Sequence, residues 1–261
     1  MKPTWLAVAL LVLWAAMKTP WETHLDATQT RLIHGMRPTI SAEMRDQLGQ
    51  GLTLAALGGF RSLAATMVWL SLYEAWSVQE WPRVRANIDL AVLLQPRDTF
   101  YWDHGAWHLA WNASIDAANN PKRGPLERMV ESRRWVDAGR DLLERGIRFN
   151  PEKPILHQRL GDLYWHRLED FNNAAEQYRV AIALPGAPEY LQRFVGYALQ
   201  KAGRTREAYD YFRDLWKKRD PADLPVRWER VERELRKLED ELNLPDDQRL
   251  FPKETQREPA T

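Results

Sequence analysis

Two stretches in the second half of the chain repeat one pattern, Leu160-Gly161-Asp162-Leu163-Tyr164 and Val195-Gly196-Tyr197-Ala198-Leu199. Their glycines lie 35 residues apart. Each stretch is followed by an alanine, then an aromatic residue four positions later, then a proline: Ala174, Tyr178 and Pro185, and Ala208, Phe212 and Pro221. A glycine in one helix and an alanine in the next let two helices pack closely, and the aromatic side chain fills the space around them. The proline ends the second helix because it has no N–H group. The matching residues and spacings therefore indicate one structural unit that recurs along the chain.

These residues resemble the tetratricopeptide repeat (TPR), in which L-G-x2-Y, A-x3-F and P recur with a period of 34 residues. The resemblance is clearest over residues 155–221 and degenerate over residues 61–151. It implies an all-α fold, a tetratricopeptide-like solenoid of helical hairpins, with the repeat domain at residues 58–242. The first copy has one extra residue between its glycine and its alanine. We expect that residue in the loop near Leu168-Glu169-Asp170.

The earlier, degenerate repeats contain an insertion. Pro96 and Pro151 are 55 residues apart, which is one period plus 21 residues. The turn-rich stretch at residues 118–125 stands between two long helical patterns, and turn residues of this kind mark loops. We therefore expect the additional residues of this repeat to lie around this loop.

Composition narrows the classes of function. The chain of 261 residues is 44% hydrophobic and 28% charged, which is typical of a globular protein. Its 37 basic and 36 acidic residues are interleaved, so we expect no nucleic-acid partner. The absence of cysteine excludes disulfides, thiolate metal sites and a cysteine nucleophile. No nucleophile elbow, phosphate-binding loop or dinucleotide-binding glycine pattern occurs, so we expect no enzyme and no cofactor.

The N-terminus carries an apolar segment, Trp5 to Met17, flanked by Lys2 and Lys18. As a helix, its 13 residues would be about 20 Å long, shorter than the roughly 30 Å hydrocarbon core of a bilayer. We interpret residues 1–18 as an uncleaved signal-anchor, with a cleaved signal peptide or a buried helix as alternatives. Its charges favour a bacterial-type inner membrane with the body outside the cytoplasm; the alternative is an exported, periplasmic protein. Residues 19–57 read as a tether with a short helix.

The C-terminal region is predicted to close the solenoid. Residues 226–242 form an amphipathic pattern with apolar residues at a 3-4 spacing: Trp228, Val231, Leu235, Leu238 and Leu242. We interpret this segment as a capping helix, because solenoids need a terminal element with one polar face. A short coiled coil that makes a dimer is the alternative, so the oligomeric state stays open. Residues 243–261 contain several prolines and many charges and are predicted to be disordered.

The resemblance also implies a binding site. In TPR proteins the first helix of each pair lines a concave groove that contacts a protein or peptide partner. The positions that correspond to this groove here are Gln158, Asp162, Trp165, His166, Arg193, Tyr197, Gln200 and Lys201. The alternative is that these are ordinary exposed residues.

A second candidate site lies in the tryptophan-rich region between Trp69 and Trp111, which holds six tryptophans. Aromatic side chains can stack on sugars or anchor peptides, but they can equally fill the core of degenerate repeats. We expect a ligand site only if at least two of Trp102, Trp107 and Trp111 face solvent in one groove. His104 and His108 could share a helix face, but no third ligand accompanies them, so we expect no metal site.

These features favour a non-catalytic, membrane-anchored scaffold or adaptor that binds proteins at the cell envelope, in a secretion or surface-assembly system. The alternative is an envelope carbohydrate or cell-wall ligand binder that uses residues 69–111.

Overall fold

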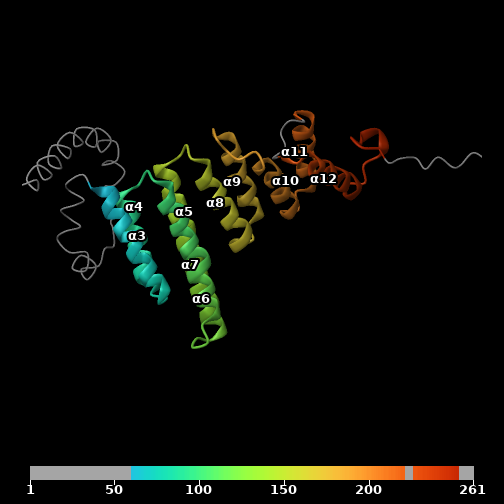
Figure 1. The fold of residues 1–261 in the computed structure, drawn as a ribbon. Coiled ribbons are helices and arrows are strands. Elements are labelled where there is room, and N and C mark those ends of the chain that lie inside the picture. The colour runs from blue at the N-terminus through green and yellow to red at the C-terminus, as the bar shows by residue number, and fades with distance from the viewer. Residues whose placement is uncertain (1–59, 221–225, 253–261) are drawn as a thin grey trace, which may run out of the picture. The chain divides into compact units, whose positions relative to one another are not determined.

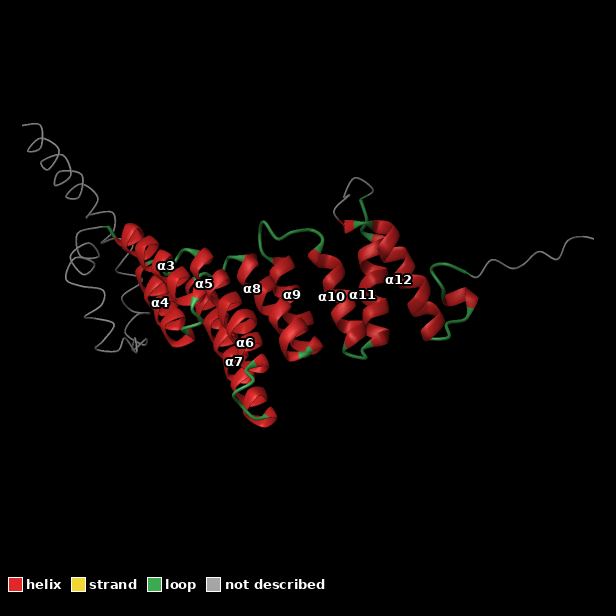
Figure 2. Cartoon of the chain, turned by 60° about the horizontal axis from the view of Figure 1, so that its bottom comes forward, coloured by secondary structure: helices red, strands yellow, loops and turns green. Residues whose placement is uncertain are grey.

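The computed structural model describes residues 60–220 and 226–252, and this part of the chain consists of helices, with no strand (Figures 1 and 2). The contacts divide the chain into two compact units, whereas the sequence predicts one domain over residues 58–242. Unit 1 ends at Phe149 and unit 2 begins at Asn150. None of the described helices is both long and apolar enough to cross a bilayer. The predicted anchor at residues 1–18 and the tether at residues 19–57 lie outside the described residues.

The described part of unit 1, residues 60–149, contains two helical hairpins. They are formed by α3 (Arg61–Ser77), α4 (Trp81–Leu94), α5 (Thr99–Trp107), the π-helical turn η1 (His108–Ala113), α6 (Ser114–Asn119) and α7 (Pro125–Phe149). In the first hairpin α3 packs on α4, and in the second α5, η1 and α6 follow one another along α7. Local sequence sets the helix starts: Pro82 stands in the first turn of α4, and the Asp98 carboxylate accepts the backbone N–H of Phe100 at 2.9 Å.

Glycines set the spacing of the second hairpin in unit 1. A Cβ atom at Gly146 of α7 would lie 2.9 Å from Cγ of Trp102, and one at Gly139 would lie 2.7 Å from the Cβ of Ala110. Both distances are too short for a real side chain, so the two helices approach this closely only because α7 has glycine there. The indole of Trp102 is fully buried against α7 and donates its Nε1–H to the carbonyl oxygen of Pro96 at 2.9 Å.

Unit 2 contains two further hairpins and a final helix. Its elements are α8 (Pro154–Leu163), the π-helical turn η2 (Tyr164–Leu168), α9 (Phe171–Ala183), α10 (Leu191–Lys201), α11 (Thr205–Lys217), α12 (Trp228–Glu241) and the 3-10 turn η4 (Asp246–Gln248). α8 packs on α9, α9 on α10, α10 on α11 and α11 on α12, which is the sequential packing that a repeat predicts.

The glycine contacts predicted from the repeat are present in unit 2. A Cβ atom at Gly161 would lie 2.6 Å from Cε1 of Tyr178, and one at Gly196 would overlap the ring of Phe212. Both aromatic side chains are completely buried. The sequence prediction that a glycine in the first helix accommodates an aromatic ring from the second is therefore confirmed.

The extra residue of the first copy lies in a helix rather than in the predicted loop. α8 passes into the π-helical turn η2, and the backbone N–H of Asp170 bonds to the carbonyl oxygen of Tyr164 at 3.0 Å. A π turn holds one residue more than an α turn, so it absorbs the insertion without moving the glycine contact. Glu169 then ends the helix in the left-handed conformation, with φ 53°.

The end of unit 2 departs from the predicted boundaries. α12 buries Val231, Leu235 and Leu238, as its amphipathic pattern predicts. The prediction that disorder starts at residue 243 is wrong for residues 243–252. The completely buried Glu239 accepts the backbone N–H groups of Leu250 at 2.6 Å and Phe251 at 3.4 Å with one carboxylate oxygen. These bonds fold the segment back onto α12.

Gly196→Ala should destabilise the chain by about 1–3 kcal/mol, because the new methyl group meets the ring of Phe212 in a closely packed core. Urea unfolding would measure the loss. Gly124→Ala is the matched control, because nothing lies within 4 Å of its Cβ position. Adding Phe212→Leu to Gly196→Ala should recover part of the stability, whereas strictly additive losses would contradict the close-contact explanation.

Candidate functional site

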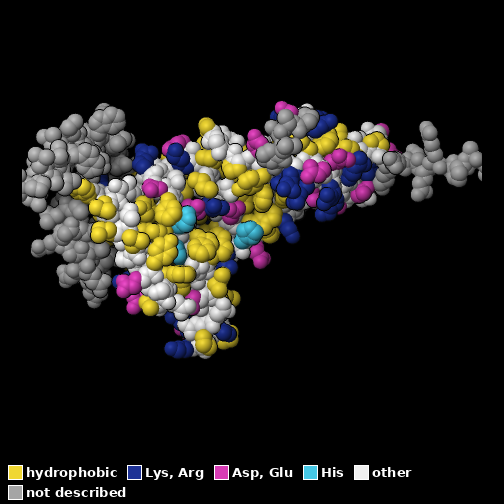
Figure 3. All heavy atoms as spheres, viewed as in Figure 1, with side chains coloured by type: hydrophobic (Ala, Val, Ile, Leu, Met, Phe, Trp, Pro, Cys, Tyr) yellow, Lys and Arg dark blue, Asp and Glu magenta, His cyan; other side chains and the backbone are white. Residues whose placement is uncertain are grey.

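Unit 1 carries a connected surface of aromatic rings, which we call the aromatic face. α3 contributes Tyr73 and Trp76, and α5 contributes Phe100, His104 and Trp107. Four of these side chains are well exposed: Tyr73 at 47%, Trp76 at 40%, Phe100 at 40% and Trp107 at 47%. Residues three or four positions apart share one face of a helix, so these spacings place the rings of each helix together. Figure 3 shows hydrophobic side chains gathered around histidines on this part of the molecule.

Two buried rings support the aromatic face from below. Trp69 lies edge-on to Phe100, with ring centroids 5.2 Å apart, and 6.0 Å from His108. The ring of His108 lies 6.4 Å from Tyr73, 6.0 Å from Trp76 and 5.2 Å from Trp107. Edge-to-face pairs at these distances are favourable and fix the relative orientation of the rings. The exposed rings are therefore held in place before any partner arrives.

His108 stays neutral in this setting. Its side chain is 4% exposed, and burial, helped by the nearby His104, lowers its pKa to about 4. Its Nδ1 lies 3.1 Å from the Asn112 amide nitrogen, which donates the hydrogen bond to the neutral ring. The role of His108 is to fill the space between four aromatic rings without bringing a charge into it.

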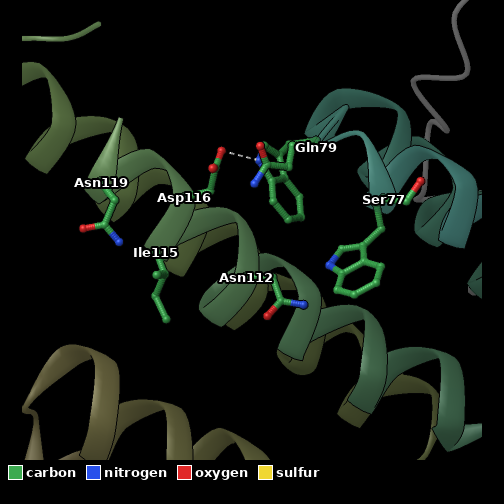
Figure 4. Close-up of a pocket in the computed structure, with 8 residues that line it drawn as sticks. Ser77, Gln79, Asn112, Ile115, Asp116 and Asn119 are labelled. Carbon is green, nitrogen blue, oxygen red and sulfur yellow. Dashed lines mark hydrogen bonds between the residues drawn. The ribbon is translucent and has the colours of Figure 1, made fainter. Parts of the chain in front are cut away.

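A pocket of about 620 Å³ adjoins the aromatic face at Trp76 (Figure 4). One wall is the loop after α3, and the other is the helix that runs from η1 into α6. Its lining combines three apolar side chains, Trp76, Trp81 and Ile115, with five polar ones, which are Ser77, Gln79, Asn112, Asp116 and Asn119. The indole N–H of Trp81 donates to the Asp116 carboxylate at 2.7 Å, which holds that wall in position. The π turn η1 carries Asn112, and such turns often occur at functional sites.

Together the aromatic face and the pocket suit recognition by contact. Exposed, rigid aromatic rings lose little conformational entropy on binding and bury a large area. The amide and carboxylate groups of the pocket can satisfy the polar groups of a ligand beside them. Asp116 is the one ionisable residue that lines the pocket.

The three tryptophans considered from the sequence as a ligand site differ in their exposure to solvent. Trp102 is completely buried against α7, Trp111 is half-buried, and Trp107 is exposed. The requirement that two of these three face solvent is therefore not met. The exposed partners of Trp107 come from elsewhere, chiefly Tyr73 and Trp76 on α3. The three-residue spacing of these two rings on one helix is the signal in the sequence that could have found them.

Two residues of the predicted groove in unit 2 are buried, contrary to the prediction of groove-lining contacts. Gln158 is 5% exposed and Arg193 is 7% exposed. The amide of Gln158 donates to the Tyr190 hydroxyl at 2.9 Å, and the guanidinium of Arg193 donates to the Tyr197 hydroxyl at 3.4 Å. Both side chains are thus covered by other residues of unit 2.

Of the other predicted groove residues, some contact neighbouring side chains of unit 2 and some are exposed. Asp162 accepts the Tyr178 hydroxyl at 2.9 Å, and Gln200 donates to Glu234 of α12 at 3.1 Å. Trp165 and Tyr197 are half-buried and both lie against the ring of Phe194. His166 and Lys201 are the exposed members of the set. A partner-binding role for this set stays a prediction.

The histidines considered for a metal site lie in different environments. His104 is exposed, stacks on Phe100 with ring centroids 4.1 Å apart, and places Nδ1 3.1 Å from the carbonyl oxygen of Phe100. His108 is buried among the aromatic rings. In the described part of the chain no three histidine or acidic side chains come close enough together to hold a metal ion.

Comparisons with known proteins find a likeness among solved structures. No protein-family model matches the chain, and a search of curated proteins finds no match. Among solved structures, a crystal structure of a thermophilic TPR protein in Thermus thermophilus is similar over 66% of this chain and 98% of that one, at 18% identity and a TM-score of 0.32. The description of helical hairpins in this chain rests on the packing of its own helices within each unit.

Acid should weaken unit 1 through His108. Because its pKa is about 4 in the folded chain and about 6.5 when unfolded, the unfolded state binds the extra proton between these values. This contribution to stability is complete above pH 6.5 and is lost as the pH falls toward 4. Urea unfolding at pH 7 and pH 5, followed by hydrogen exchange of the α5 amides, would measure it.

His108→Gln should reduce the loss of stability between pH 7 and pH 5. His104→Gln replaces an exposed ring, so that variant should keep most of the loss. An equal loss in the wild-type chain and in His108→Gln would show that other groups cause the acid sensitivity.

Proposed function

We propose that the chain is a non-catalytic adaptor that holds a protein partner through the aromatic face of unit 1. The observation that carries the proposal is the exposure of Tyr73, Trp76, Phe100 and Trp107, each at 40–47%, on two packed helices. Aromatic residues are enriched among those that contribute most to binding between proteins, and connected apolar surfaces of this kind mark interaction sites. The face is rigid, since buried rings hold each exposed ring, and rigidity reduces the entropic cost of binding.

The same surface supports binding rather than catalysis. Catalytic sites bring together titratable groups with shifted pKa values in a pocket. The one residue of unit 1 with a strongly shifted pKa, among those described, is His108, and it is enclosed by rings instead of facing the pocket. Asp116 in the pocket is bonded to Trp81. His108 and Asp116 thus hold the site in its folded shape, and they do not form a general acid and base pair.

The proposal places the adaptor at a bacterial-type inner membrane, attached by residues 1–18 with its body outside the cytoplasm. This part rests on the apolar segment from Trp5 to Met17 and the positive charge that precedes it. The export of a cleaved form to the periplasm is the alternative. A role in secretion or surface assembly remains a prediction from the sequence.

Site-specific photocrosslinking tests the adaptor function. A photoreactive phenylalanine analogue at Trp107 of the full chain, expressed in its own organism, should give a discrete crosslinked protein. Tyr73→Ala with Trp76→Ala should reduce that product by tenfold or more, because truncating an aromatic residue at a binding hot spot costs about 2 kcal/mol or more.

Val180 is the matched control position. It is 42% exposed on α9, which belongs to unit 2 and contributes nothing to the aromatic face, and the same photoreactive residue there should not give this product. Identical products from both positions, or a product that persists after the Tyr73 and Trp76 substitutions, would reject the aromatic face as the binding site.

A carbohydrate ligand is the second candidate, favoured by the pocket beside Trp76. Sugars bind where an aromatic ring lies next to amide and carboxylate side chains, and here Asn112, Asp116 and Asn119 adjoin Trp76. Titration calorimetry with envelope polysaccharide fragments would detect such binding. Saccharide binding that Asn112→Ala abolishes, together with no protein crosslinked at Trp107, would replace the adaptor proposal with this one.

A further inference from the structure

The insertion between Pro96 and Pro151 lengthens a hairpin. α7 has 25 residues, whereas α3 has 17 and α4 has 14. The hairpin formed by α6 and α7 therefore projects past the ends of α3 and α4, as both ribbon views show (Figures 1 and 2). We call residues 119–134, which form its end, the hairpin tip.

The hairpin tip exposes three apolar side chains on consecutive turns of α7. Leu126 is 70% exposed, Met129 is 63% exposed and Val130 is 51% exposed. Their spacing of three and four residues puts them on one side of the helix. The buried residues of α7 begin only at Val136, so the tip contributes no side chain to the core from this part of the helix. Water contact with three neighbouring apolar side chains is unfavourable, and a bound surface would relieve it.

The same tip is strongly basic. Residues 121–134 contain five cations and two carboxylates, a net charge of +3, while the whole chain has a net charge of +1. The cations are Lys122, Arg123, Arg128, Arg133 and Arg134. Figure 3 shows dark blue and yellow side chains side by side at this end of unit 1.

The cations of the tip remain available to a partner. Within residues 60–220 and 226–252, Lys122 and Arg128 form no ion pair. The other three cations pair with carboxylates: Arg123 lies 3.6 Å from Glu127 and 3.7 Å from Glu131, Arg134 lies 2.9 Å from Glu131, and Arg133 lies 3.2 Å from Asp137. Such exposed pairs contribute little to stability and exchange readily. The tip therefore presents apolar side chains surrounded by positive charge.

We propose that the hairpin tip docks on the surface of an anionic lipid bilayer. Lys and Arg side chains attract the negative headgroups, and apolar side chains between them enter the boundary with the acyl chains. A bilayer offers both properties over a flat surface that the end of a projecting hairpin can reach. An acidic polypeptide without apolar side chains would match the charge but would leave Leu126, Met129 and Val130 without an apolar partner. The proposal uses residues of the tip alone and does not depend on the aromatic face or on the N-terminal segment.

A fluorescent probe on the tip tests this proposal in the full chain. Because the chain has no cysteine, Met129→Cys creates a unique site for an environment-sensitive nitrobenzoxadiazole label. With vesicles of phosphatidylcholine and phosphatidylglycerol, the emission should shift to the blue and increase several-fold. Vesicles of phosphatidylcholine alone should give no shift, and high salt should reverse the effect by screening the charges.

Arg148→Cys provides the control position. It is exposed on the same helix but 19 residues farther along, about 28 Å from Met129, so its probe should not respond. Lys122→Glu with Arg128→Glu should remove the response at position 129, as should Leu126→Ser with Val130→Ser. These side chains are outside the core, and circular dichroism should show an unchanged fold.

Two results would overturn the proposal. One is an unchanged probe at position 129 while the labelled chain sediments with the anionic vesicles, which would mean that another segment binds them. The other is a blue shift with soluble polyglutamate and none with vesicles, which would assign the tip to an acidic protein.

Discussion

The close approach of two helices at a glycine is the contact on which both units depend. In unit 2 the rings of Tyr178 and Phe212 occupy the space that a side chain at Gly161 or Gly196 would need. In unit 1 the indole of Trp102 lies in the same way against α7. A large ring that fits into the facing helix adds buried area and fixes the rotation of its own helix. Hairpins of this kind are therefore set by such glycine contacts, and the other faces of their helices are left for surface or function.

Burial of Trp102 explains why the aromatic face exists. With Trp102 turned toward α7, the residues on the other side of α5 must turn away from that helix, and these include Phe100, His104 and Trp107. Phe100 contacts Trp69 of α3 instead, and Trp107 contacts the neutral His108. The same packing that stabilises the hairpin thus orients the proposed binding surface. A charged ring in place of neutral His108 would disturb both at once.

The sequence predicted the helical hairpins well because glycine, alanine and aromatic residues at fixed spacing have few structural solutions. It predicted the site less well. A count of tryptophans locates a region, but only packing decides that Trp102 is core and Trp76 is surface. Sequence could not show either that Gln158 and Arg193, carried over as groove residues, are buried and bond to tyrosines within unit 2. The prediction of disorder was wrong for residues 243–252, because composition cannot show that a buried Glu239 is available to accept backbone N–H groups.

Hydroxyl-radical footprinting, read residue by residue by mass spectrometry, tests the central claim that the aromatic face is a covered binding surface. In the purified chain, Trp76 and Trp107 should be oxidised rapidly, and the buried Trp102 should be protected. In intact cells of its own organism, Trp76 and Trp107 should also become protected, while the exposed Val180 in unit 2 should keep its rate of oxidation. Equal oxidation of Trp76 and Trp107 in the two settings would contradict the account.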